Sequence, residues 1–125
     1  MKNPKGVTLV EVLVSVFILT IGILSSLLFF TRAMTANDLS RDMTEATTHG
    51  EYVLEDMRAR PSLANITSTN WVAFVDRSGL TTLPQEMILV SFTNQQANPL
   101  DVHVSVGWAG RLRPGHVDLR TELTK

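Results

Sequence analysis

A single carboxylate stands at the start of a long apolar segment. Glu11 lies within "KGVTLVEVLV" and is followed by nineteen consecutive uncharged residues, Val12 to Phe30. A buried carboxylate near the centre of a membrane helix costs roughly 2.5–3.5 kcal/mol on insertion scales, and less near the interface. Glu11 is therefore a candidate functional residue whose chemistry is charge pairing. The alternative is a carboxylate that only snorkels to the lipid headgroups.

The other residue types that carry chemistry form no recognisable site. The chain has no cysteine, which excludes disulfides, thiolate metal sites and a cysteine nucleophile. His49, His103 and His116 are scattered and lack the spacing of metal ligands, so we expect no metal and no cofactor. No nucleophile, base and orienting group fall within one motif. We therefore assign no catalytic residue and expect a protein that is not an enzyme.

The charge pattern does not favour nucleic acid. The formal net charge is −1 with both signs mixed along the chain. "GRLRPG" places Arg111 and Arg113 on a predicted exposed turn, where two arginines ordinarily serve solubility. We therefore expect no nucleic-acid partner.

The segment that carries Glu11 has the length of one membrane span, because about 20 helical residues cross about 30 Å of hydrocarbon. We predict a transmembrane helix over residues 7–31. Lys2 and Lys5 precede it and only Arg32 follows closely, which predicts a cytoplasmic N-terminus and a C-terminal head on the other side. A buried helix of a soluble core and a secretory signal peptide are the alternatives, and the apolar run exceeds the usual signal length.

Helical periodicity continues beyond the apolar run. Residues 32–60 are predicted as an amphipathic continuation of the same helix, from Val7 to about Arg58, because Pro61 ends the pattern. One face of this stretch carries the apolar residues Leu39, Met43, Ala46, Val53, Leu54 and Met57.

The last part of the chain, residues 61–125, is predicted as a connecting region followed by an antiparallel sheet. Within the connection, "WVAFV" is expected to form a short strand. "EMILVSF", "DVHVSVGW" and "HVDLRTEL" then alternate apolar and polar residues, which is typical of half-buried strands. The apolar face of the sheet needs a cover, and the amphipathic helix supplies one. We therefore predict an α+β fold: a long N-terminal helix packed on three or four antiparallel strands.

The N-terminal segment "KGVTLVEVLVSVFILTIG" resembles the cleavage and methylation segment of type IV prepilins and type II secretion pseudopilins. The shared features are a short basic leader, a glycine, a glutamate five residues later and a long apolar helix. Along the rest of the chain, "EATTHGEYVLEDMRARPS" and the final two strands look like those of minor pilins of the pilus-modification kind and of the minor pseudopilins.

The resemblance implies how the chain is processed and used. A membrane-embedded prepilin peptidase would cut after Gly6, removing residues 1–6 as a leader, and would methylate the new amino terminus of Val7. Val7 departs from the phenylalanine that is most common there, which puts the rate of methylation in doubt. Glu11 would bind the amine of a neighbouring subunit during filament assembly.

The function predicted from this resemblance is that of a minor pilin-like structural subunit of a membrane-anchored filament, or of its tip or initiation complex. The expected partners are the peptidase, other pilins or pseudopilins, an inner-membrane assembly platform and the lipid bilayer. The expected location is the inner membrane, with a periplasmic or extracellular head, and the assembled pilus or pseudopilus. A minor pseudopilin of a type II secretion system and a non-polymerising anchored binding module are the alternatives.

Overall fold

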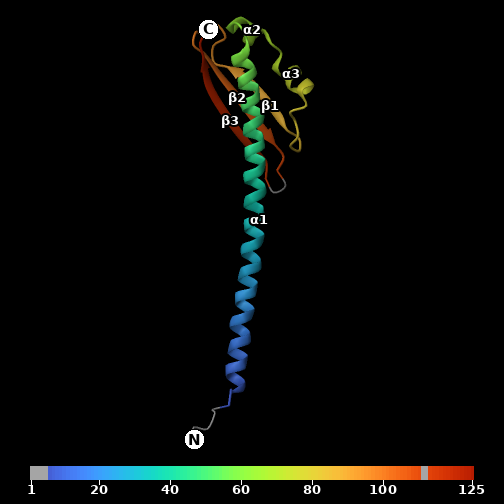
Figure 1. Ribbon diagram of the computed structural model, residues 1–125, viewed down its shortest axis with the longest axis vertical. Helices are drawn as coiled ribbons and strands as arrows, with labels where there is room; N and C mark the ends of the chain where they lie inside the picture. The colour runs from blue at the N-terminus through green and yellow to red at the C-terminus, as the bar shows by residue number, and fades with distance from the viewer. Residues whose placement is uncertain (1–5, 111–112) are drawn as a thin grey trace. The chain divides into compact units, whose positions relative to one another are not determined.

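The computed structural model describes residues 6–110 and 113–125 (Figure 1). Its elements are α1 (Leu9–Ala59), α2 (Leu63–Ser68), α3 (Trp71–Ser78), β1 (Met87–Phe92), β2 (Leu100–Trp108) and β3 (Gly115–Leu123). The chain divides into two compact units, Met1–Asp38 and Leu39–Lys125, and α1 runs through both. The predicted α+β class is confirmed. Residues 1–5 of the predicted leader, with Lys2 and Lys5, lie outside the described residues.

The part of α1 in the first unit exposes its apolar side chains on every side. Its first turn is capped by the Thr8 hydroxyl, which accepts a hydrogen bond from the backbone N–H of Glu11 at 3.2 Å. The most apolar window of the helix buries none of its residues within the chain, and α1 is long and apolar enough to cross a membrane. This segment is therefore not buried by its own chain, as the core helix of a soluble protein would be.

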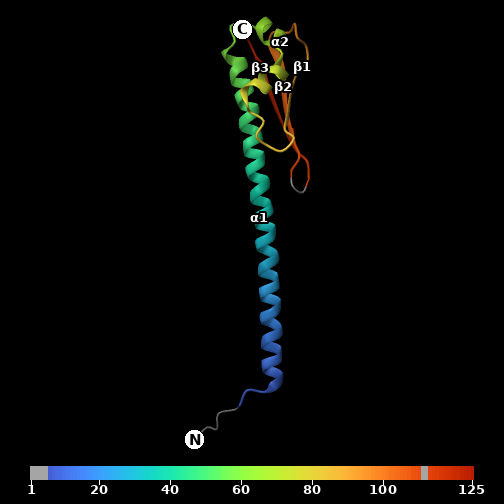
Figure 2. The same ribbon diagram turned by 90° about the vertical axis from the view of Figure 1, so that its right-hand side faces the viewer.

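The second unit, called the head below, contains a three-stranded sheet in the order β1-β2-β3, with both pairs antiparallel. Alternate side chains of β2 point to one face and are buried there: Leu100, Val102, Val104, Val106 and Trp108. The C-terminal part of α1 covers this face, as the edge-on view shows (Figure 2). The predicted pairing of helix and sheet is thus observed, with three strands.

Gly50 allows α1 to lie close to the sheet. A Cβ atom at this position would stand 2.5 Å from Leu119 Cδ1 and 3.4 Å from Val106 Cγ2. The buried residues of α1 are Ala46, His49, Gly50, Val53, Leu54 and Met57. Two members of the predicted stripe lie outside this core, since Leu39 is half-buried and Met43 is exposed. Helical periodicity identifies the inward face but not how far the sheet extends beneath it.

The expected strand "WVAFV" is wrong, because these residues form the helix α3. The Asn70 side chain accepts a hydrogen bond from the N–H of Ala73 at 3.0 Å and caps the first turn, while Gly79 ends the helix with a φ of 66°. Trp71 and Val75 are buried one turn apart, whereas Val72 is exposed. The burial period is therefore helical, and the connecting region contains α2 and α3 rather than a fourth strand.

Candidate processing and assembly site

The peptide bond between Gly6 and Val7 lies just before α1, which begins at Leu9. Val7 is 71% exposed, and a Cβ atom placed on Gly6 would meet no atom within 4 Å. The described backbone around this bond is thus neither helical nor covered by the rest of the chain. Such a bond is accessible to a protease, and a glycine lets the catalytic groups approach the backbone closely.

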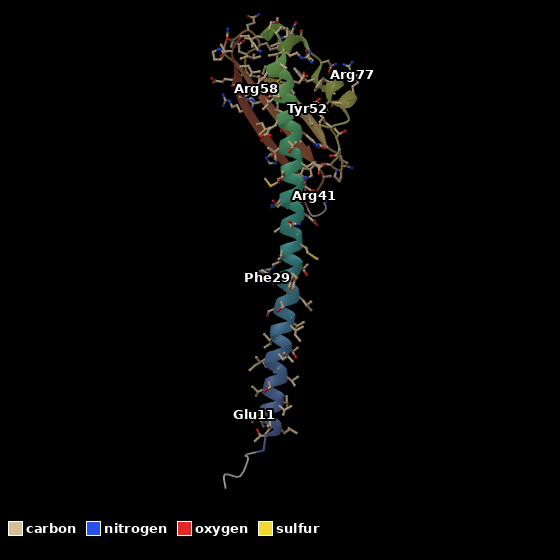
Figure 3. The ribbon with its side chains drawn as sticks, in the orientation of Figure 1. Glu11, Phe29, Arg41, Tyr52, Arg58 and Arg77 are labelled. Carbon is tan, nitrogen blue, oxygen red and sulfur yellow. The ribbon has the colours of Figure 1, made fainter. Side chains whose placement is uncertain are left out.

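Glu11 lies in the first turn of α1, four residues after Val7 (Figure 3). The Ser15 hydroxyl donates a hydrogen bond to the backbone carbonyl of Glu11 at 2.7 Å. The carboxylate itself is exposed and forms no ion pair with any residue that the structure describes. It lies at the N-terminal end of the helix, where the helix dipole favours a negative charge. Among the described residues, the site therefore presents one exposed anion close to the bond that would be cut.

A family comparison decides what this end of the chain is. The model of the prokaryotic N-terminal methylation motif matches residues 1–27. The chain carries the signature of type IV pilin and pseudopilin precursors. No curated protein and no solved structure matches the chain significantly.

The family of proteins that carries this motif is structural rather than catalytic. Among residues 6–110 and 113–125, no three His, Asp or Glu side chains come together as metal ligands. Of the two arginines considered for nucleic-acid contact, Arg113 is exposed and Arg111 lies outside the described residues. The three histidines occupy different environments. His49 is buried, whereas His103 and His116 lie on the outer face of the sheet.

The head of the pilin-like precursor contains a buried polar pair that the sequence did not reveal. His49 Nδ1 lies 2.6 Å from Glu86 Oε1, and the side chains are 11% and 0% exposed. Glu86 Oε2 also accepts the N–H of Leu83 at 2.9 Å. A second hydrogen bond, from the Thr82 hydroxyl to Glu45, ties the same loop to α1. These contacts fix the loop before β1 against the helix.

A cluster of hydrogen-bonded side chains on the outer face of the sheet joins β2 to β3. The Arg120 guanidinium donates to both carboxylate oxygens of Asp101, at 2.9 and 2.6 Å, and the Thr93 hydroxyl donates at 2.8 Å. The hydrogen bonds from Arg120 and then from Thr93 lower the pKa of Asp101 from its ordinary value of 3.8 to about 2. The same contact with Asp101 raises the pKa of Arg120.

This lowered pKa predicts an acid-dependent contribution to head stability. Because the folded state binds the Asp101 proton more weakly than the unfolded state, the contribution is complete above about pH 4 and is lost as the pH falls towards about 2. We expect the stability advantage of the wild type over Asp101→Asn to shrink across that window. Thermal unfolding at pH 5, 4, 3 and 2 measures it. Asp118→Asn, on the same face, is the matched control, and an advantage for Asp101 that does not change with pH would contradict the prediction.

Proposed function

We propose that this chain is a minor pilin-like subunit that is cut after Gly6, methylated on Val7 and assembled into a membrane-anchored filament or its tip or initiation complex. The observation that carries the proposal is the exposed carboxylate of Glu11, which no described residue pairs. It lies in the first turn of an uncovered apolar helix, next to an accessible Gly6–Val7 bond. The match to the methylation motif supports the same reading.

The chemistry links these features. Cleavage after Gly6 creates a new amine at Val7, and this amine is cationic before and after a single methylation. Within a bilayer, the attraction between a paired anion and cation offsets part of the desolvation cost of each. Glu11 of an incoming subunit and the Val7 amine of a neighbour supply such a pair. We infer that this ion pair sets the axial position of one helix against the next.

The proposed location follows from the charges that flank the span. The leader carries Lys2 and Lys5, which favour the cytoplasmic side of the inner membrane, and the head then lies on the periplasmic or extracellular side. The partners in this proposal are the prepilin peptidase, other pilins or pseudopilins, an assembly platform in the inner membrane and the lipid bilayer. A minor pseudopilin of a secretion system has the same physical requirements, and the genes that accompany this one distinguish the two machines.

Processing is the direct test of the proposal. We expect the mature chain to begin at Val7, so that loss of Lys2 and Lys5 changes the formal side-chain charge from −1 to −3. N-terminal sequencing and intact mass of the membrane-bound protein measure the start and the added methyl group. As a matched pair, Gly6→Leu should block cleavage and Gly22→Leu, within the span, should not. A chain that starts at Met1, or one that is cut beyond Phe30, would refute the proposed function.

A further inference from the structure

Strand β3 has a free edge. It pairs with β2 along one side, and no strand in the described part of the chain pairs with its other side. The register with β2 is one-to-one from Gly115 to Leu123, so the strand contains no bulge in that ladder, and it contains neither proline nor lysine. Soluble proteins usually protect an edge with one of these features because the unpaired backbone groups can bind another strand.

The inner face beside this edge is only partly covered. The inward residues of β2 are buried, but Val117, Leu119 and Thr121 of β3 are half-exposed. An open groove of about 670 Å³ lies between α1 and β3, lined on the strand side by Leu119, Arg120 and Thr121. A strand added to β3 would extend the sheet at this groove and bury more of that apolar surface.

The outer face of β3 carries charges of alternating sign. His116, Asp118, Arg120 and Glu122 occupy successive outward positions. In an antiparallel pair of two copies centred on Leu119, Asp118 faces Arg120 and His116 faces Glu122, and symmetry repeats both pairs. Within its own head, Arg120 also binds Asp101 through Nε and Nη2. His116 can donate a ring N–H to a carboxylate whether or not it is protonated. On the inner face, Val117 then lies opposite Thr121, and Leu119 lies opposite its own copy.

No neighbouring register has this complementarity. Residues that face each other across an antiparallel ladder lie on the same face of the sheet, so the centre can shift only from Leu119 to Asp118 or Arg120, or further along the strand. Centring the pair on Asp118 places that carboxylate against its own copy and His116 against Arg120. Centring it on Arg120 places Asp118 against Glu122. A parallel in-register pair sets every charge against itself.

From this pattern we propose that the free edge of β3 is an interaction surface for a second copy of this chain, which binds as an antiparallel strand with Leu119 on the two-fold axis. The result is a six-stranded sheet across two heads. This pairing goes beyond the proposed filament function and does not depend on it.

The symmetry determines which copies can pair. The two-fold axis is perpendicular to the sheet, and the head segment of α1 lies along one face of that sheet. The rotation therefore reverses the direction of this segment between the two heads. Two heads whose α1 segments run in opposite directions beside the shared sheet meet this condition.

Cysteine pairs test the register, because the chain has no native cysteine. His116→Cys and Glu122→Cys full-length chains, purified in detergent, are treated with a short bifunctional maleimide separately and as a mixture. We expect a covalent dimer only in the mixture, because the two copies of position 116 lie six residues apart along the paired strands, about 20 Å. Both changes are on the exposed outer face and leave the core intact. A dimer in either single sample, or none in the mixture, would overturn the proposal.

A charge exchange tests the chemistry independently. Glu122→Lys sets a cation against His116 of the other copy, and we expect the dimer measured by sedimentation to weaken by about 5- to 30-fold. The new cation faces Asp101 within its own head, and this attraction offsets its repulsion from Arg120 on the same face. His116→Glu combined with Glu122→Lys restores opposite charges and should restore the dimer. Equal dimerisation of wild type and Glu122→Lys, or failure of the double variant to recover, would count against pairing by these charges.

Discussion

Glu11→Val should leave insertion and processing of the chain intact and abolish its incorporation into filaments. The substitution removes a charge from the first turn of an apolar helix, so the span inserts at least as well as before. The Gly6–Val7 bond lies outside the helix and is unchanged, so cleavage should proceed. In the proposed assembly, however, the cationic amine of the neighbouring subunit loses its counter-charge, and an unpaired charge at low dielectric costs several kcal/mol.

The experiment compares membrane and filament fractions by immunoblotting, with the mobility of the cleaved form checked in the same lanes. We expect the Glu11→Val chain in the membrane and not in sheared filaments. Ser15→Ala is the matched control, because it changes a polar side chain one turn later whose hydroxyl bonds only to the carbonyl of Glu11. Normal incorporation of Glu11→Val would show that the carboxylate has no docking role in this subunit.

Glu86→Ala should lower the free energy of unfolding of the head by roughly 2–5 kcal/mol, because each buried donor left without an acceptor typically costs about 1–3 kcal/mol. Glu86 is fully buried and satisfies both His49 and the N–H of Leu83. Without it, His49 and this N–H are left buried with no acceptor. Replacement of both His49 and Glu86 by leucine should recover much of the loss, but not the bond to Leu83.

Tryptophan fluorescence during denaturation of the detergent-solubilised chain measures this effect. The two tryptophans, Trp71 and Trp108, are 5% and 3% exposed and both lie in the head, so the signal reports on that unit alone. Glu55→Gln, an exposed position on the same helix as His49, is the control and should change stability by less than about 0.5 kcal/mol. A loss for Glu86→Ala no larger than that of the control would show that the pair is not important for stability.

Periodicity predicted the elements whose apolar pattern is long enough to be unambiguous. The end of α1 before Pro61 and all three strands of the sheet were recognised in this way. "WVAFV" was misassigned because five apolar-rich residues fit either a strand or a helix. The capping residues Asn70 and Gly79 are the sequence signals that distinguish a helix from a strand here.

The candidate site was predictable in a different way. Glu11 stands out in the sequence because a charge interrupts an apolar run, so its position needs no knowledge of tertiary structure. The pair of His49 and Glu86 joins residues that are 37 positions apart and meet only when the loop before β1 folds against α1. Neither residue has a local pattern that marks it as buried. The alternation of charge on β3 was visible, but its self-complementarity has meaning only once β3 is known to be an edge strand.

The close packing of α1 against the sheet at Gly50 has a mechanical consequence. The helix that carries the apolar segment also contributes Ala46, Val53, Leu54 and Met57 to the head's core, without a break between Leu9 and Ala59. Tension along α1 therefore pulls the row of Ala46, Gly50, Val53 and Met57 parallel to the sheet surface, so the contacts are loaded in shear and resist together. A force perpendicular to the sheet would instead separate them one after another. We therefore expect the head to resist force along α1 more strongly than force that lifts one end of α1 from the sheet.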